Sequence, residues 1–350
     1  MTRFLQLHLL TFFPPANLNR DDTGRPKTAV VGGATRLRLS SQALKRAWRT
    51  SPVFATALAG HMGQRTQRLG EDVQAHLLDR QVAPDRAKAV ARGVAGVFGK
   101  LKDEKDPNAT RIEQLAFIAP EERTAALALA ERAAASGEAI DPKKARLLRT
   151  ADTAADIALF GRMLADDPAY NREAAAQVAH AITTHRVTVE DDYYTAVDDL
   201  KQPSEDAGAG FLGEAAFGSG VFYLYLCVDR ALLVRNLGGD APAADLAATA
   251  LGALTEAAAT TAPSGKQNSF AAHGRAQYVL AERGDAQPRT LAGAFSRPVA
   301  GNDLVEDSIK ALDGFRQALD KAYGPANLQE KIMHVGVGGS LAEIIAFARG

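Results

Sequence analysis

Two apolar runs that lie far apart in the chain constrain the fold more than any other feature of the sequence. Residues 3–13 (RFLQLHLLTFF) are almost continuously apolar, which is typical of a strand buried on both faces. Residues 217–228 (FGSGVFYLYLCV) are rich in aromatic and β-branched side chains and give the strongest strand pattern in the chain. The core is therefore expected to include a sheet.

The segment between these runs has a helical texture. Residues 54–150 are rich in Ala, Leu, Arg and Glu at a spacing of about 3.6, which predicts a helical insertion. The same criteria predict further strands at 36–39, 156–163 and 276–281, and helices at about 41–50, 171–182, 242–260 and 303–322. Strands separated by helices, with a long helical insert, favour an α+β fold.

Composition limits the class of protein. A length of 350 residues suggests two domains or one domain with a large insertion, and 46% apolar residues are enough for a sizeable core. The 41 basic and 41 acidic side chains balance, which excludes a uniformly basic surface but allows a local basic patch. Cys227 is the only cysteine, so no intrachain disulfide or thiolate metal cluster can form. No apolar run has the length of a membrane span or signal peptide, and we expect a soluble, cytoplasmic protein.

A strongly basic segment spans residues 20–49. It holds eight cationic side chains against two carboxylates, a net charge of +6 in a chain whose total is zero. After Ser40, a plausible N-cap, polar side chains at helical spacing share one face, and these are Gln42, Lys45, Arg46 and Arg49. Leu44 and Trp48 fall on the opposite side, and Arg36 and Arg38 share one face of the preceding strand. The two faces can present cations to one anionic ligand, although a solvated charged surface is the alternative.

An acidic segment balances the basic one. Residues 186–206 hold seven carboxylates against two cations, a net charge of −5. Pro203, Gly208 and Gly210 favour a long loop or a projecting hairpin. Tyr193 and Tyr194 lie between the acid pairs. Aromatic side chains at a hairpin tip can stack on nucleic-acid bases. The residues alone favour the simpler interpretation, in which the tyrosines attach the hairpin to the body of the protein.

Catalytic and metal-ligand patterns are weak throughout the chain. His180 and His185 are five residues apart, a spacing that does not place both on one helix face, and no third ligand accompanies them. The adjacent Asp21 and Asp22 are most simply loop and helix-start residues. The glycine-rich stretches fit neither dinucleotide-binding nor P-loop patterns. We expect no catalytic residue, no metal site and no cofactor; a metal-dependent nuclease using these four residues is the alternative.

Seven motifs distributed along the chain carry a family resemblance. They are NLNRDD (17–22), GG-x-x-R-x-R-x-SSQ-x-LKRA (32–47), DIAL-x-GRM (156–163), AHAITTH (179–185), TAVDDL (195–200), SGVFY (219–223) and GKQ (265–267). In this order they resemble the backbone subunit of the type I-E CRISPR surveillance complex, Cascade (the CasC family). The resemblance covers residues 1 to about 285. A backbone subunit of another CRISPR subtype is a second possibility.

The resemblance implies a specific architecture and a non-catalytic role. It implies an RNA-recognition-motif-like (ferredoxin-like) palm from residues 1–53 and 151–350, helical fingers at 54–150, and a thumb hairpin at about 186–222. Copies of the family subunit stack head to tail along the spacer of a CRISPR RNA and leave most bases exposed for pairing with target DNA. The implied partners are CRISPR RNA, target DNA through the guide duplex, further copies of the chain, and the large, small, handle-end and repeat-processing subunits of Cascade.

The resemblance also implies an RNA-binding surface. A subunit that holds any spacer sequence should contact phosphates and 2′-hydroxyls rather than base edges. Met163 and Tyr194 match the positions of an apolar residue and a thumb aromatic that interrupt base stacking, with Tyr193 as an alternative to Tyr194. Arg38, on its face of the strand at 36–39, is also predicted to bind RNA. The cationic and polar positions that match the family's RNA-facing surface are Arg20, Lys27, Gln42, Lys45, Arg46, Arg49 and Lys266.

Overall fold

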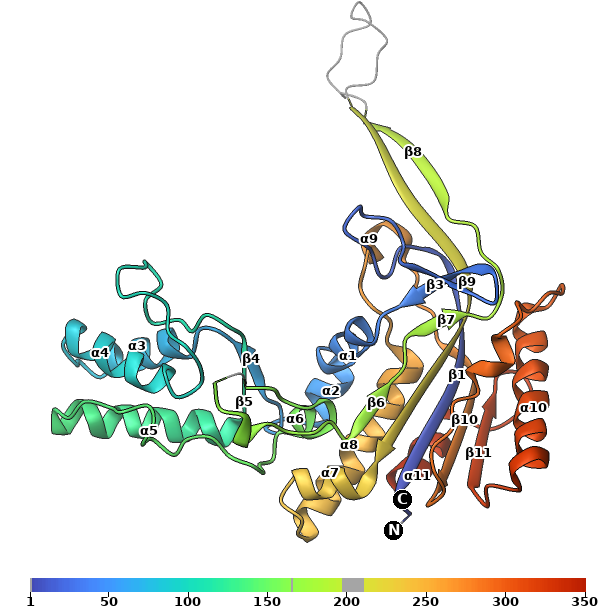
Figure 1. Cartoon of the computed structure of the whole chain (residues 1–350). Coiled ribbons are helices and arrows are strands. Elements are labelled where there is room, and N and C mark those ends of the chain that lie inside the picture. The colour runs from blue at the N-terminus through green and yellow to red at the C-terminus, as the bar shows by residue number, and fades with distance from the viewer. Residues whose placement is uncertain (1, 165, 197–210) are drawn as a thin grey trace, which may run out of the picture. The chain divides into compact units, whose positions relative to one another are not determined.

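The computed structural model describes residues 2–164, 166–196 and 211–350, which form a mixed α+β fold (Figure 1). The α+β class expected from the sequence is therefore confirmed. The described chain divides into two compact units. The sheet unit comprises residues up to 54, 178–227 and 251–350, and the helical unit comprises 55–177 and 228–250.

The sheet unit is built on strands in the order β11-β10-β1-β9-β7-β3-β2. Antiparallel pairing joins β1 to β10, β10 to β11, β2 to β3, β3 to β7 and β7 to β9. The strands are β1 (Phe4–Ala16), β2 (Thr28–Val31), β3 (Ala34–Leu39), β7 (Ala181–Thr183), β9 (Phe211–Asp229), β10 (Ala276–Gly284) and β11 (Gln329–His334). The two apolar runs that dominate the sequence become the neighbouring strands β1 and β9 at the centre of this sheet.

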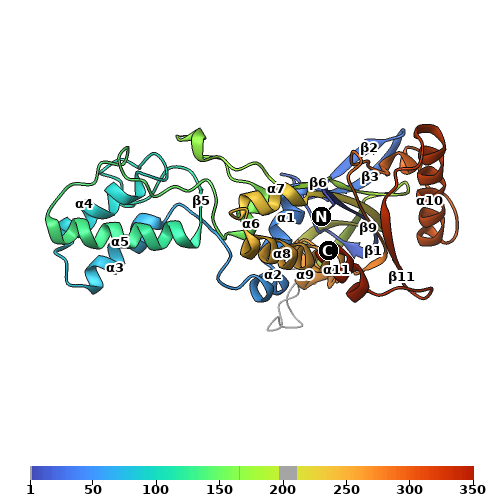
Figure 2. The same cartoon turned by 90° about the horizontal axis from the view of Figure 1, so that it is seen from below.

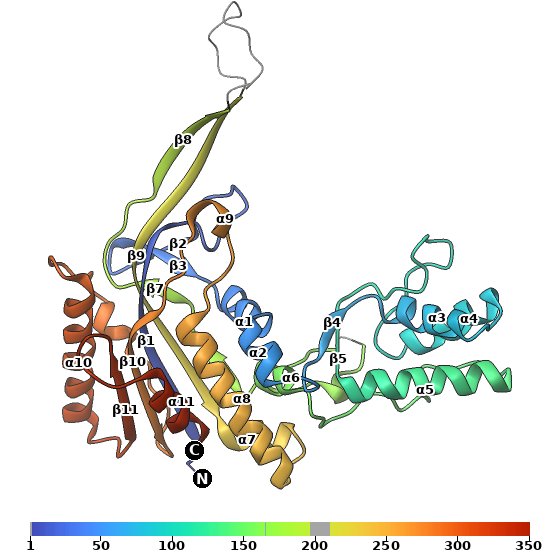
Figure 3. The same cartoon turned by 180° about the vertical axis from the view of Figure 1, so that it is seen from behind.

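Burial of β1 explains its continuous apolar sequence. Every residue from Leu5 to Leu10 is buried, so side chains on both faces of the strand are covered. Helix α10 (Leu304–Tyr323) contributes Ile309 and Leu312 to one cluster with Tyr223 of β9. Helix α11 (Leu341–Arg349) packs on β10 and β11 (Figure 3). The C-terminal tail, which lies beyond the region covered by the resemblance, therefore supplies an edge strand and a covering helix.

A β-hairpin projects from the sheet (Figure 1). Strand β8 (Glu190–Ala196) runs antiparallel to the start of β9, with a register from Glu190 opposite Phe217 to Ala196 opposite Phe211. All seven residues of β8 are exposed. The connecting residues 197–210, which include the predicted carboxylates of 198–206, lie outside the described residues.

The helical unit contains most of the segment predicted to be helical. Its helices include α3 (Leu69–Asp79), α4 (Pro84–Ala95) and α5 (Pro120–Ser136), seen together in Figure 2, and β4 (Gln64–Thr66) pairs with β5 (Ala116–Ile118). Apolar side chains of the three helices form one core, as the 3.6-residue spacing predicts. The unit also includes residues 151–177 and 228–250, because buried polar contacts tie these segments to α5 and to one another.

Two predicted elements were wrong in type. Residues 156–163 were expected to form a strand, but Ala155–Phe160 forms helix α6. Residues 171–182 were expected to be helical, but Ala176–Val178 is strand β6 and residues 181–183 are β7. In a short apolar run, periodicity does not distinguish a buried helical turn from a strand. Here pairing with β3 and β9, which are distant in sequence, decides the conformation of 181–183.

Candidate nucleic-acid interface

Helix α1 (Ser41–Arg49) carries the predicted cationic face. Ser40 is the N-cap, and its hydroxyl oxygen accepts a hydrogen bond from the Ala43 N–H at 3.4 Å. Leu44 and Trp48 are buried, which fixes the orientation of the helix against the sheet unit. The four polar residues on the other face are exposed or half-buried, and these are Gln42, Lys45, Arg46 and Arg49. Partial burial lowers the pKa of the Lys45 ammonium from its ordinary value.

The loop before β2 brings two more predicted residues to the unit surface near α1. The Asp21 carboxylate accepts hydrogen bonds from the Thr23 N–H at 2.9 Å, the Thr23 hydroxyl at 2.7 Å and the Arg25 N–H at 3.0 Å. These bonds close a tight turn and lower the pKa of Asp21. Exposed Arg20 and half-buried Lys27 flank the turn. The carboxylate proposed for a nuclease therefore has a structural role in shaping this loop.

The side chain of Asn19 connects this loop to α1. Its Oδ1 accepts the Ser40 N–H at 2.8 Å, and its carbonyl oxygen accepts the Lys27 N–H at 2.8 Å. The start of the cationic helix and the backbone of Lys27 are thus held by the same residue. Sequence reasoning assigned no role to Asn19, although it lies within the NLNRDD motif.

The two arginines of β3 have different environments, which corrects the expectation that both present cations to a ligand. Arg36 is fully buried, and its guanidinium donates to the carbonyl oxygens of Thr183 at 2.7 Å and Phe295 at 3.1 Å. Arg38 is half-buried and bonds the ring of His180 at 2.8 Å. Alternation along a strand places both on one face, but only the tertiary structure shows that the segment at 292–296 covers Arg36. Arg38 alone stays part of the surface.

Lys266 lies close to Arg20 although the two are distant in sequence. Gly265 packs so closely on the 17–18 backbone that a Cβ there would lie 2.4 Å from the Leu18 carbonyl oxygen. Lys266 follows with a positive φ of 52° and an exposed side chain. An open cleft of about 340 Å³ results, lined among others by Asn17, Arg20, Arg25, Glu214 and Lys266. The cleft combines cations from the basic loop with one from the GKQ motif.

Ion pairs link the basic loop to the hairpin. The Arg25 guanidinium lies 2.8 Å from the Asp191 carboxylate and 3.8 Å from that of Glu214. This pairing balances one cation of the basic segment with carboxylates of β8 and β9. Part of the charge separation predicted from sequence is therefore neutralised within the unit.

The two tyrosines occupy opposite faces of the hairpin. Tyr193 is 74% exposed and lies opposite Glu214, whereas Tyr194 is 47% exposed and lies opposite Gly213. The Tyr194 ring lies over this glycine, because a Cβ at Gly213 would be 2.3 Å from the Tyr194 Cζ. Tyr194 therefore packs on its own hairpin.

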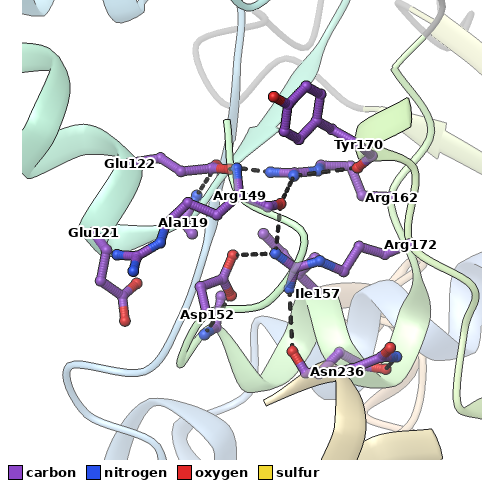
Figure 4. Close-up of polar contacts among 12 residues, drawn as sticks. Ala119, Glu121, Glu122, Arg149, Asp152, Ile157, Arg162, Tyr170, Arg172 and Asn236 are labelled. Atoms are coloured by element: carbon purple, nitrogen blue, oxygen red, sulfur yellow. Dashed lines mark hydrogen bonds and ion pairs between the residues drawn. The ribbon is translucent and has the colours of Figure 1, made fainter. Parts of the chain in front are cut away.

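Met163 belongs to the helical unit, whereas the other predicted RNA-binding residues belong to the sheet unit. Its side chain is 81% exposed, between the buried residues Arg162 and Leu164. Polar contacts around Arg162 connect this segment to α5 (Figure 4). The sequence singled out Met163 through its motif but gave no sign of this network.

The two histidines of the AHAITTH motif have separate contacts. His180 accepts from Arg38, while the His185 Nε2 accepts the Val221 N–H at 3.2 Å and its Nδ1 donates to the Arg186 carbonyl oxygen at 2.8 Å. Burial lowers the pKa of both rings. Among residues 2–164, 166–196 and 211–350, no three His, Cys, Asp or Glu side chains are grouped to hold a metal ion.

The comparisons with known proteins include one family model and two solved structures of CRISPR RNA-guided surveillance complexes. A family model described as CT1975-like protein matches residues 5–343. A chain of the solved structure "CRISPR RNA-guided surveillance complex, pre-nicking" is 31% identical, with a TM-score of 0.85 and 99% of each chain covered. A chain of a second, "CRISPR RNA-guided surveillance complex", is 27% identical, with a TM-score of 0.74 over 97% of this chain and 94% of that one. No curated protein matches this chain. Within the described parts, no helix is long and apolar enough to cross a membrane.

Proposed function

Because the chain belongs to the CT1975-like protein family, we propose that it is a CRISPR RNA-binding backbone subunit of a Cascade surveillance complex. Its similarity over nearly the whole chain to a component of an RNA-guided surveillance complex supports a role in such a complex. The motifs quoted from the sequence favour the type I-E subtype. The observation that carries the RNA-binding role is that one unit holds both the α1 cations and a cleft lined by Arg20 and Lys266, with the Asn19 side chain joining the basic loop to the start of α1.

The chemistry of this surface suits a grip on RNA that does not depend on its sequence. Lys and Arg side chains on α1 and around the cleft can neutralise phosphates, which carry no base identity. A helix that is held by buried Leu44 and Trp48 presents these charges on a rigid element. Such a surface holds a spacer of any sequence and leaves its bases available for pairing with target DNA.

The architecture fits three parts of a backbone subunit. The sheet unit corresponds to an RNA-recognition-motif-like palm, the helical unit to fingers, and the β8–β9 hairpin to a thumb. Tyr194 on the hairpin and Met163 in the fingers provide the aromatic and apolar side chains that interrupt base stacking. Copies of the chain then assemble head to tail along the guide, a heterologous arrangement that grows with the length of the RNA.

The subunit itself is proposed to be non-catalytic, with cleavage carried out by other proteins. Support comes from the uses that the structure gives to the candidate nuclease residues: Asp21 closes a turn, and His180 and His185 bind neighbouring groups. The similarity to chains of CRISPR RNA-guided surveillance complexes supports CRISPR RNA, further copies of the chain and the other Cascade subunits as its proposed partners.

Native mass spectrometry on guides of increasing length tests the proposal. The number of bound copies should rise in steps with RNA length, because each added stretch of spacer offers phosphates for one more copy. A fixed stoichiometry that ignores RNA length would contradict the backbone role. Incubation of the same samples with Mg²⁺, Mn²⁺ or Zn²⁺ should leave RNA and DNA intact, and turnover lost in an Asp21→Ala variant would instead favour the nuclease.

A further inference from the structure

The segment around Met163 has an alternating pattern of burial. Arg162 is 4% exposed, Met163 is 81% exposed and Leu164 is 6% exposed. The backbone of Arg162 pairs with that of Arg172 through two hydrogen bonds, N–H to O at 3.1 Å and 2.8 Å. On the other side of Met163, the Leu164 N–H donates to the Asn171 Oδ1 at 2.6 Å. The backbone on both sides of the exposed methionine is therefore held.

Arg162 is anchored beneath this segment by α5. Its guanidinium lies 2.7 Å from the Glu122 carboxylate, and both side chains are fully buried. The same guanidinium donates to the carbonyl oxygens of Arg149 at 2.9 Å, Phe117 at 3.2 Å and Tyr170 at 3.3 Å. Glu122 also accepts the Ala119 N–H at 3.0 Å. Figure 4 shows Glu122, Arg149 and Tyr170 around the Arg162 side chain.

A second buried ion pair holds the segment whose backbone pairs with Arg162. The Arg172 guanidinium lies 2.7 Å from the Asp152 carboxylate, with side chains 1% and 0% exposed. Arg172 also donates to the Arg149 carbonyl oxygen at 2.8 Å, so a single backbone oxygen accepts from both arginines (Figure 4). The two ion pairs form one connected network.

Two fully buried ion pairs are a costly way to stabilise a core. Desolvation of the charges offsets much of their attraction, and apolar residues of similar volume often stabilise as well. The pairs contribute a defined geometry, because the planar guanidinium group of arginine can donate hydrogen bonds to several acceptors at once and so holds the surrounding backbone in one orientation. Methionine has three rotatable bonds and is a poorly directed side chain unless its backbone is fixed.

We propose that this network, with Asn171, positions Met163 to contact the guide. The inference rests on the proposed function, in which Met163 interrupts base stacking on the RNA. Glu122, Arg162, Asp152 and Arg172 are positioning residues that act through the backbone of residues 162–164, and none of them touches the RNA itself.

The test compares chemical reactivity along a guide in assembled complexes of the full chain. Met163→Ala defines the reactivity change that follows from losing the side chain. Asn171→Ala removes the partly buried hydrogen bond to the Leu164 N–H and should alter the same guide positions, whereas Asn171→Asp keeps an acceptor oxygen and should retain the wild-type pattern. Arg162→Lys loses the guanidinium fork and should behave like Asn171→Ala. Combining Asn171→Ala with Met163→Ala should add nothing to Met163→Ala alone.

A matched control separates positioning from general stability. Leu77→Ala opens a cavity in the core of the same unit and removes no polar group of the network, so it should lower the melting temperature while leaving the guide pattern unchanged. If Met163→Ala changes the pattern but Asn171→Ala and Arg162→Lys do not, the positioning inference is overturned and the proposed function stands. Alteration by Leu77→Ala equal to that by Asn171→Ala also overturns it. If the wild-type chain does not bind guide, both fail together.

Discussion

Neutralising the cationic face of α1 should weaken RNA binding by the same factor for every guide sequence. The change is Lys45, Arg46 and Arg49 to glutamine, which keeps good helix formers on α1 and leaves the buried Leu44 and Trp48 in place. The reason is that these side chains can meet phosphates, which carry no base identity. Charge-reversed versions of the three residues should act in the same direction and more strongly.

The magnitude follows from the number of cations removed. Each phosphate contact on a single strand adds about 0.7 to the slope of log K against log salt, so three contacts should flatten it by about 2 units. Between about 50 and 200 mM salt, the wild-type affinity should then fall by roughly 20-fold more than that of the variant. Arg46 and Arg49 also lie in the last turn of α1, where each cation stabilises the helix dipole by about 0.3–1 kcal/mol. A small loss of thermal stability is therefore expected.

Fluorescence anisotropy with several labelled RNAs over a salt series measures both effects. A control variant with Lys310, Lys321 and Lys331 changed to glutamine removes the same net charge from α10 and β11. The control should keep the wild-type slope. The reasoning is refuted if the α1 variant keeps its slope, if the control flattens equally, or if the α1 variant changes preference among RNA sequences.

Three further outcomes are expected. Gly213→Ala should swing the Tyr194 ring aside at a cost of about 1 kcal/mol, altering guide reactivity in assembled complex while thermal melts barely change. Gly265→Ala should force a Cβ toward a backbone carbonyl oxygen 2.4 Å away, which costs about 1–3 kcal/mol and displaces Lys266; anisotropy should show weakened RNA binding, and unchanged affinity would exclude Lys266 from the interface. Burial lowers the pKa of His8 below its usual 6.5, so the unfolded chain takes up a proton first and stability should be lost as the pH falls below 6.5, by up to about 1.4 kcal/mol per pH unit. Thermal melts from pH 7 to 5 measure this, and a His8→Gln variant that kept the full slope would contradict it.

Features set by local physics were predictable from the sequence. The continuous apolar run of β1 and the aromatic run of β9 identify central strands, because only burial on both faces favours such sequences. The cap Ser40 and the spacing of Leu44 and Trp48 determine α1 and direct its polar residues outward. The sequence therefore predicts which residues share the polar face of α1.

Features set by distant partners were not predictable in this way. Residues 156–163 are a short, largely apolar run and residues 171–182 are rich in alanine, and the type of each depends on pairing and packing with segments far away in sequence. Arg36 and Arg38 do share one face of β3, as alternation along the strand predicts. The segment ending at Phe295 covers Arg36, however, and Arg38 stays at the surface. The approach of Lys266 to Arg20 and the burial of Arg162 against Glu122 likewise depend on tertiary contacts. The sequence thus determined which elements carry charge, and only the tertiary structure decided which charges face solvent, because burial is a property of what packs over a residue.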